Sequence, residues 1–194
     1  GYCVIGTSIT GNVDFQHENL KVLQLNLTDQ KSIEACAASV AEIDILINNA
    51  GVLYDEGETV VVTDLFRKTL EVNLIGTIDL TEKLIPKVNE GGHIINISSS
   101  AGSLAEVETE SHAAGYYPAY KISKCALNMY TRTLAMRLKN QKVSSVHPGW
   151  VKTDMGGEEA PMTPEEAALH IFNTATDATI ETGQFWFRGE KYPW

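Results

Sequence analysis

A tyrosine and a lysine four residues apart, Tyr120 and Lys124, are the residues of this chain whose types and spacing most directly suggest chemistry. A phenol has an unperturbed pKa of about 10, so it exchanges protons readily at neutral pH only if a fixed cation favours its anionic form. We expect Lys124 to supply that cation, because residues four apart share one face of a helix.

The sequence around this pair favours a helix. Pro118 suits a first helical position, and residues 119–140 contain no further proline or glycine. An apolar face of this helix would be formed by Ile122, Ala126, Met129 and Leu134. Tyr117 and Lys121 have the same spacing, but a residue before proline is pushed out of the α region. Tyr120 is therefore the better candidate, although an exposed helical tyrosine is the simpler interpretation of the pair alone.

Three apolar segments end in small or polar residues, as strands of a parallel sheet do when their ends bind ligands. Residues 43–47 lead into Asn48, Asn49, Ala50 and Gly51. Residues 93–97 lead into Ser98, Ser99 and Ser100, and residues 143–146 lead into His147, Pro148 and Gly149. We expect all three ends at the carboxyl edge of one sheet.

Helical patterns lie between these strands. Asp29 can cap a helix from Ser32 to about Val40, and residues 63–88 form a long apolar-periodic run interrupted near residues 73–76. A capping box at Thr163 opens a helix that reaches about Asn173. The alternation predicts an α/β class: one Rossmann-like domain over residues 1–194, with a doubly wound parallel sheet.

Read in order, these pieces resemble the short-chain dehydrogenase/reductase family over essentially the whole chain. The matching motifs are residues 48–51, Asn73, Ser99, residues 120–124 and residues 148–153. Residues 147–157 and 183–194 are similar to the carbonyl-reductase-like and C-factor-like members.

The resemblance implies an NAD(P)H-dependent oxidoreductase that reduces an aldehyde or ketone, or reversibly oxidises the alcohol, by hydride transfer. Tyr120 would donate the proton, and Lys124 would lower the Tyr120 pKa and hold the nicotinamide ribose. Ser99 would hydrogen-bond the substrate oxygen, with Ser98 and Ser100 as fallback choices. Asn73 would hold a water that relays protons to Lys124.

By the same resemblance, a larger set of residues would contact the cofactor. The strand ending at Thr7 and Ser8 is followed by no acidic residue that could bind a ribose 2′-hydroxyl, which favours NADP(H) over NAD(H). The expected contacts are Thr7, Ser8, Asn26, Leu27, Asn48, Asn49, Ala50, Gly51, Tyr120, Lys124, Pro148, Gly149, Val151 and Thr153.

The amino end departs from the family pattern. Residues 6–11 contain no third glycine of a phosphate-binding turn, and no helix of normal length fits before Lys21. We therefore expect residues 2–6 to be the family's second strand and the chain to lack the βα unit with the glycine-rich turn. The family's second and third strands would then pair directly with the fourth, dock elsewhere or leave exposed edges, and nucleotide binding would be weak.

The sequence leaves two other functions open. One is a catalytically inactive remnant, or a dimerising non-enzymatic subunit unable to bind nucleotide. The other is a different reaction of the family, such as epimerisation. The non-enzymatic subunit would dimerise through the helices that begin at Thr63 and Pro118. For an enzyme, the partners would be a small carbonyl or alcohol substrate and further copies of the chain, in a homodimer or homotetramer.

The composition narrows the possible partners and locations. The net charge of −10 argues against nucleic acid and anionic membranes, and no apolar run is long enough to span a bilayer. Three scattered cysteines and five unclustered histidines predict free thiols, no metal site and a cytoplasmic protein. The acidic residues Glu106, Glu108 and Glu110 and residues 156–166 are either loops over the substrate site or plain surface loops. Trp150 and Met155 are either substrate contacts or ordinary packing residues.

Overall fold

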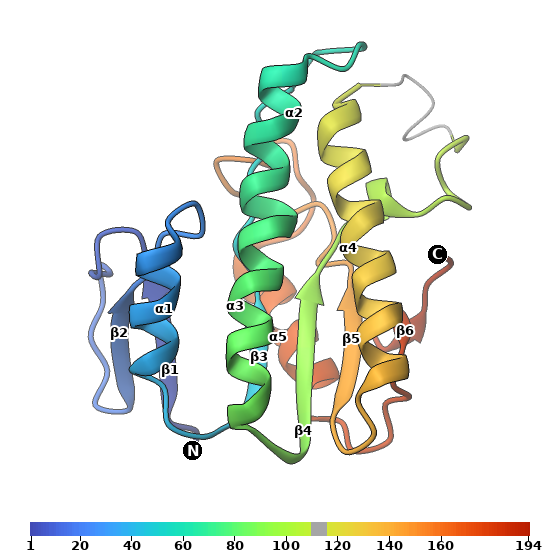
Figure 1. The fold of residues 1–194 in the computed structure, drawn as a ribbon. Coiled ribbons are helices and arrows are strands. Elements are labelled where there is room, and N and C mark those ends of the chain that lie inside the picture. Colours follow the sequence, from blue (N-terminus) through green and yellow to red (C-terminus); the bar gives the residue numbers. More distant parts are fainter. Residues whose placement is uncertain (110–115) are drawn as a thin grey trace.

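The computed structural model of the chain describes residues 1–109 and 116–194, and it has an α/β fold with helices packed against parallel strands (Figure 1). Its strands are β1 Val4–Ser8, β2 Leu20–Gln24, β3 Ile43–Asn48, β4 Val88–Ile97, β5 Lys142–Val146, β6 Gln184–Phe187 and β7 Glu190–Lys191. Its α-helices are α1 Gln30–Ala38, α2 Thr63–Leu70, α3 Thr77–Leu84, α4 Pro118–Arg137 and α5 Pro164–Thr176. Shorter turns are the π-helical η1 Glu71–Gly76 and the 3₁₀-helical η2 Ile85–Lys87 and η3 Ser100–Gly102.

The strands form two separate sheets. One has five strands in the order β3-β4-β5-β6-β7, parallel except for the antiparallel hairpin of β6 and β7. The other is the parallel pair β1-β2. Within the described residues, no strand is hydrogen-bonded to both β1 and β3, and Val4, Ile5 and Ile47 on these two strands are 49%, 38% and 42% exposed. The predicted α/β class is confirmed, and the predicted exposed strand edges lie at β1 and β3.

The long helical run predicted from residue 63 is interrupted where the sequence indicated. Helices α2 and α3 are joined by η1, a π-helical turn that contains Asn73 and Gly76. A Cβ atom on Gly76 would lie 2.0 Å from the carbonyl oxygen of Leu27. Only glycine therefore lets this helix approach the segment after β2 so closely. Asn73 lies in the same wider π turn and is 1% exposed.

Helix α4 begins at Pro118 as predicted and ends at Arg137. Tyr117 before it has left the right-handed helical region, with φ 49° and ψ 53°. Of the residues predicted to share an apolar face, Leu134 is buried, whereas Ile122 and Met129 are 43% and 68% exposed. The buried face instead carries small and polar residues, which hydrophobic periodicity does not detect: Ala119, Ser123, Lys124, Leu127, Asn128, Thr131 and Leu134.

The predicted helix caps are present. Asp29 accepts a hydrogen bond from the N–H of Lys31, although α1 starts at Gln30, before the predicted Ser32. Thr163 and Glu166 form the reciprocal capping box of α5. One hydrophobic cluster packs α1 against β2 and α3, and two others lie against β4 and β5.

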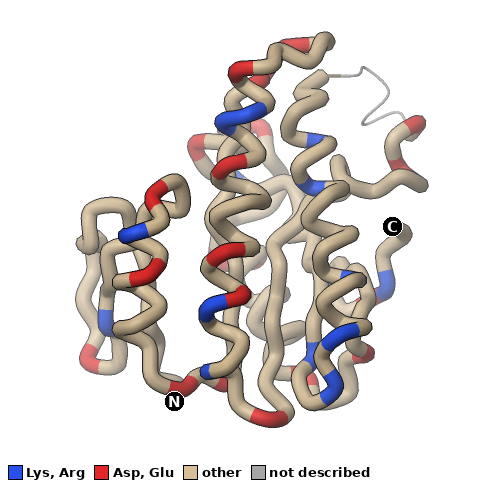
Figure 2. Tube along the Cα trace, in the orientation of Figure 1, with Lys and Arg blue, Asp and Glu red and all other residues tan. Residues whose placement is uncertain are grey.

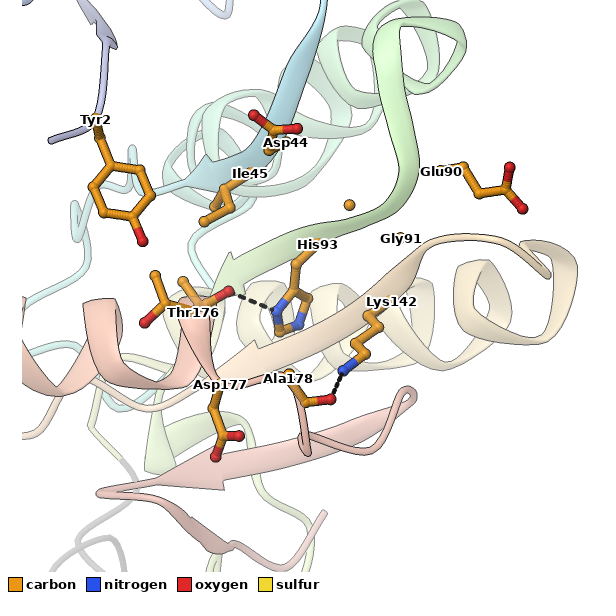
Figure 3. Close-up of a pocket in the computed structure, with 12 residues that line it drawn as sticks. Tyr2, Asp44, Ile45, Glu90, Gly91, His93, Lys142, Thr176, Asp177 and Ala178 are labelled. Carbon is orange, nitrogen blue, oxygen red and sulfur yellow. Dashed lines mark hydrogen bonds between the residues drawn. The ribbon is translucent and has the colours of Figure 1, made fainter.

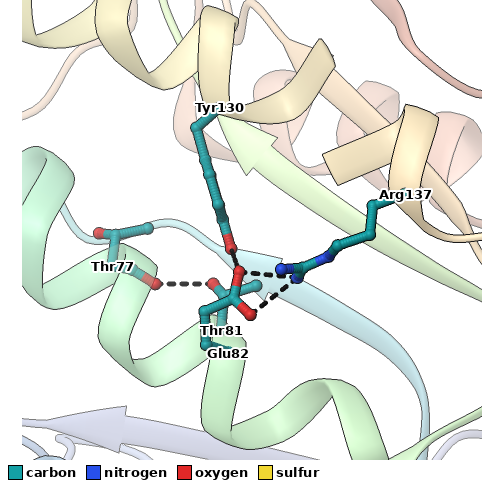
Figure 4. Close-up of polar contacts among 5 residues, drawn as sticks. All are labelled: Thr77, Thr81, Glu82, Tyr130 and Arg137. Atoms are coloured by element: carbon teal, nitrogen blue, oxygen red, sulfur yellow. Dashed lines mark hydrogen bonds and ion pairs between the residues drawn. The ribbon is translucent and has the colours of Figure 1, made fainter. Parts of the chain in front are cut away.

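Helices α3 and α4, which lie side by side, are linked by hydrogen bonds of a charged side chain. The charged residues of α4 are all basic, whereas those of α2 and α3 include both signs (Figure 2). Glu82 on α3 accepts hydrogen bonds from Arg137 at 2.8 and 2.7 Å and from the Tyr130 hydroxyl at 2.9 Å (Figure 4).

In the part of the chain that the structure describes, no helix is long and apolar enough to cross a membrane, and no group of three or more His, Cys, Asp or Glu side chains could hold a metal ion.

Candidate active site

Ser99 and Tyr120 meet at the carboxyl edge of the five-stranded sheet. Tyr120 lies in the first turn of α4, and the side chain of Ser99, which follows the end of β4, lies close enough to its phenol to influence its pKa. The neighbouring serines have other partners. Ser98 is 1% exposed and its hydroxyl donates to the carbonyl oxygen of Lys124 at 3.4 Å, while the Ser100 side chain is hydrogen-bonded to Tyr192.

The turn η3 brings Ser99 to Tyr120 by packing directly on the backbone of α4. A Cβ atom on Gly102 would lie 2.7 Å from the backbone carbon of Lys124, so a side chain at this position would push η3 away. The Asn128 amide also donates to the carbonyl oxygen of Gly102 at 3.1 Å. The small residues after β4 therefore have a structural reason: they let the strand end reach the helix.

Lys124 is 3% exposed, and its Nζ donates to the carbonyl oxygen of Ile97 at 2.8 Å. Nζ lies over the face of the Tyr120 ring, 5.6 Å from the ring centroid. Burial lowers the pKa of Lys124 to about 8. A Cβ atom on Gly51 would stand 3.3 Å from Nζ, so glycine leaves room above the amine.

The pKa of Tyr120 is raised, which differs from the expectation that Lys124 would lower it. Burial is the largest cause, the hydrogen bond with Ser99 opposes it, and Tyr117 raises the pKa further. The physical reason is the direction of the lysine, since its amine bonds the Ile97 carbonyl and faces the ring rather than the phenol oxygen.

Asn73 fastens the segment after β3. Its side-chain Oδ1 accepts from the N–H of Val52 at 2.8 Å, and its Nδ2 donates to the carbonyl oxygen of Val52 at 2.9 Å and to the Ser123 hydroxyl at 3.0 Å. This amide thereby ties the segment after β3 to α4. Its predicted water-holding role stays a prediction.

Most of the predicted cofactor residues lie at the carboxyl ends of strands. Asn49 and Ala50 are exposed after β3, and Thr7 is exposed on β1. After β5, Pro148, Gly149 and Val151 are half-buried and Thr153 is exposed.

The side chains of four other predicted contacts form hydrogen bonds or packing contacts within the protein. Asn48 is buried, and its Nδ2 donates to Thr81 and to Asn96, both at 2.8 Å. The Leu27 side chain belongs to the hydrophobic cluster around α1. Asn26 Oδ1 accepts from the N–H of Thr28 at 3.0 Å. A fourth, the Ser8 hydroxyl, donates to the carbonyl oxygen of Asn12 at 2.7 Å.

Two features of the site were missed from the sequence. The first is a network of buried polar side chains that extends from Asn48 through Asn96. Asn96 Nδ2 donates to Thr131 at 2.8 Å, and the Ser145 hydroxyl donates to the same threonine at 2.9 Å. Polar residues inside apolar strands were the signal that could have revealed it. The second feature is the buried carboxylate of Asp55, which no periodic pattern marks.

The predicted loops over the site are placed in part. Glu106 is half-buried and Glu108 exposed, whereas Glu110 lies outside the described residues. Trp150 and Met155 are 56% and 43% exposed, and Trp150 Nε1 donates to the carbonyl oxygen of Gly156 at 2.7 Å. Their contacts with substrate stay predictions.

A cavity of about 290 Å³ opens at the other end of the sheet (Figure 3). His93, Asp44, Glu90, Lys142 and Asp177 are among the residues that line it. Ser99, Tyr120 and Lys124 are not, so this cavity is separate from the candidate active site.

Comparison with known proteins identifies the family. Residues 9–164 match the family model described as short chain dehydrogenase, and the chain therefore belongs to the short-chain dehydrogenase/reductase family. It is 33% identical to 1-hydroxy-2-glutathionyl-2-methyl-3-butene dehydrogenase of Rhodococcus sp. (strain AD45), over 83% of this chain and 74% of that protein. It is 32% identical to the C-signal protein of Myxococcus xanthus, over 78% of this chain and 93% of that protein.

Similarity to solved structures indicates which group of this family the chain belongs to. The NADPH-bound carbonyl reductase from chicken fatty liver superimposes with a TM-score of 0.81 at 30% identity, covering 92% of this chain and 79% of that one. The protein thus has the Rossmann-like fold of an oxidoreductase family and falls in its carbonyl-reductase-like group.

Proposed function

We propose that this protein is an NADP(H)-dependent reductase of an aldehyde or ketone that also oxidises the corresponding alcohol. The observation that carries the proposal is the convergence of three side chains, since the amine of Lys124 lies 5.6 Å from the centroid of the Tyr120 ring and Ser99 lies beside the phenol. The preference for NADP(H) is supported by the NADPH bound in the chicken carbonyl reductase and by the lack of an acidic residue directly after β1.

The residues around Lys124 fit the nicotinamide end of such a cofactor. Gly51 leaves open the space that a Cβ atom would fill beside Nζ, and an ammonium has three donors, of which Ile97 uses one. Asn49 and Ala50, which directly precede Gly51, are exposed, as is Thr153 in the loop after β5. When bound, NADPH supplies the hydride.

The chain's own residues then handle the oxygen of the substrate. The raised pKa of Tyr120 keeps its phenol protonated at neutral pH, as a proton donor to a developing alkoxide requires. Ser99 supplies a hydrogen bond to the same oxygen, and Lys124 donates to the ribose. Asn73 holds the segment after β3 so that Gly51 and Lys124 stay adjacent.

Replacing Tyr120 by Phe tests this function. Removal of the proton donor should lower kcat by about a hundredfold or more while leaving the affinity for NADPH nearly unchanged. Tyr117→Phe is the matched control, because this neighbouring phenol should be dispensable. Reduction of a panel of aldehydes and ketones, followed by NADPH absorbance, gives the rates. Near-normal turnover in Tyr120→Phe would show that the assignment is wrong.

A second candidate is a catalytically inactive protein that keeps the fold but does not bind nucleotide. It is favoured by one observation: β1 is followed by a loop and β2, not by a glycine-rich turn and a helix whose N-terminus could hold a pyrophosphate. Titrating NADPH into the protein and following its fluorescence separates the two candidates. Saturable binding below about 1 mM would reject the inactive protein, since it requires a binding free energy of roughly −4 kcal/mol.

For the oligomeric state, we propose a homodimer or homotetramer formed through the outer face of α4. Ile122, Met129 and Met136 recur every seven residues on this helix and are 43%, 68% and 74% exposed. Met129→Glu should shift the protein towards monomer in sedimentation velocity, whereas Leu169→Glu on α5, 60% exposed, should not. Identical sedimentation of wild type and Met129→Glu would reject this interface.

A further inference from the structure

Asp55, in the segment between β3 and α2, is a buried carboxylate with one hydrogen bond. It is 1% exposed, and its Oδ2 accepts from the backbone N–H of Ala119 at 2.6 Å. Its Oδ1 has no hydrogen-bond partner in the described part of the chain. Since an uncompensated buried charge is costly, the position of this side chain calls for a reason.

The reason is found at the start of α4. Tyr117 precedes the helix and provides no side-chain cap, and Pro118 at the first position has no N–H. The N–H of Ala119 is therefore the first donor of a 20-residue helix, and Asp55 is the group that satisfies it. A negative charge is favourable there because the helix dipole is positive at its N-terminus.

The segment that carries Asp55 is held at two places. Near its beginning, Val52 is paired with the Asn73 amide. Near its end, Glu58 accepts at its carbonyl oxygen from the N–H of Tyr117 at 2.9 Å, and its own N–H bonds the carbonyl oxygen of Asp55 at 3.1 Å. One continuous segment thus leads from beside Lys124 to the residue that precedes Tyr120.

We propose that Asp55 is a positioning residue for Tyr120. By fixing the Ala119 N–H, it sets the first turn of α4 and so the place of the Tyr120 hydroxyl relative to Ser99. Asp55 acts through the helix and touches no reacting atom. The expected effect of Asp55 on kcat rests on the proposed reductase function. Its effect on the first turn of α4 can be measured without any turnover.

Three variants separate the parts of this role. Asp55→Ala removes both the acceptor and the charge, Asp55→Asn keeps an acceptor but removes the charge, and Glu56→Gln is the control at an exposed neighbouring acid. Hydrogen exchange of the Ala119 and Tyr120 amides is measured relative to that of Leu127 in the middle of α4. The titration of Tyr120 is obtained from the absorbance difference between each variant and the same variant carrying Tyr120→Phe.

In Asp55→Ala, we expect amide exchange in the first turn of α4 to rise by about tenfold, the effect of losing a buried hydrogen bond, with little change at Leu127. We also expect the titration midpoint of Tyr120 to move and kcat to fall while the KM for NADPH stays near that of wild type. Asp55→Asn should recover most of the exchange protection, and Glu56→Gln should match wild type in every measurement.

Wild-type exchange and wild-type Tyr120 titration in both Asp55 variants would overturn the inference. If Asp55→Ala does not fold, Asp55→Ser, whose shorter side chain falls away from Ala119, is compared with Asp55→Asn by the same two measurements. Failure of the reductase function has a different signature, since the wild type would then reduce no carbonyl compound, or Tyr120→Phe would retain turnover, whatever Asp55 does to exchange and titration.

Discussion

Burial shifts the pKa values of Tyr120 and Lys124, the two titratable residues of the candidate active site, in opposite directions. It raises the pKa of Tyr120 and lowers that of Lys124 to about 8. At neutral pH the tyrosine is therefore a phenol and the lysine is still an ammonium. This is the pair of protonation states that carbonyl reduction requires, a proton on the donor beside a cation for the ribose. Burial favours the protonated phenol of Tyr120, whereas Ser99 opposes it.

The lowered pKa of Lys124 predicts an alkaline limit to activity. A buried amine favours its neutral form, so the ammonium is lost as pH rises through about 8 instead of the ordinary 10.5. We expect kcat/KM for reduction to fall above that pH. Lys124→Arg keeps its charge, so the pH above which kcat/KM falls should rise by about one pH unit or more, at a lower overall rate. The pH–rate profiles of both proteins test this, and an unmoved limb in the arginine variant would assign it to another group.

At the scale of elements, α4 is where the site is assembled, because three segments distant in the sequence are fastened to it. The turn η3 packs on its backbone at Gly102, the segment after β3 reaches its first turn through Asp55, and Glu82 of α3 binds Tyr130 and Arg137 further along (Figure 4). The small and polar residues of its buried face follow from these close approaches. A more apolar helix would pack well but would hold these segments less closely.

Gly102→Ala should disturb the site through packing. The added Cβ atom would lie 2.7 Å from the α4 backbone, which has no flexible end to move aside. We expect the free energy of unfolding to fall by about 1–3 kcal/mol and kcat to fall with it, since Ser99 moves with η3. Gly6→Ala is the control, because its Cβ atom would meet only Leu20 Cδ1 at 3.4 Å. Chemical denaturation and NADPH-linked rates report both effects, and equal stability of the two variants would contradict this packing argument.

At the scale of the whole molecule, the two ends of the five-stranded sheet differ in what they hold. The carboxyl edge carries Ser99 and Tyr120, whereas the cavity at the other end contains His93, which is 4% exposed (Figure 3). The His93 Nδ1 donates to the carbonyl oxygen of Ala175 at 3.3 Å, and its Nε2 accepts from the Ser144 hydroxyl at 2.9 Å. This side chain is therefore held neutral in the fold, and burial lowers its pKa from 6.5 to about 4.

The lowered pKa of His93 predicts a loss of stability in mild acid. Above pH 6.5 the imidazole is neutral in both the folded and the unfolded chain. As pH falls from 6.5 to about 4, the unfolded chain binds a proton that the folded protein excludes, so the free energy of unfolding decreases. The decrease is on the order of 3 kcal/mol for this group.

His93→Gln tests that dependence, since an amide can keep both hydrogen bonds but does not titrate in this range. We expect its unfolding free energy to fall less steeply between pH 6.5 and 4 than that of wild type. The acidic groups lining the cavity, Asp44, Glu90 and Asp177, are the same in both proteins and cancel in the comparison. The exposed His17→Gln serves as control, and parallel curves for wild type and His93→Gln would contradict the prediction.

Features that depend on neighbours along the chain could be predicted from the sequence. Apolar runs predicted β3, β4 and β5, cap chemistry predicted α1 and α5, and the interruption at Asn73 predicted η1. The motif order was enough to indicate the family, since each motif is a short stretch whose residue types suffice.

The tertiary structure alone decided what depends on contacts between distant residues. It turned Lys124 towards Ile97 and buried Asp55 against Ala119, 64 positions away. It also left β1 and β3 in separate sheets. Such pairings are set by how helices and strands pack in three dimensions, and neither periodicity nor capping patterns carry that information.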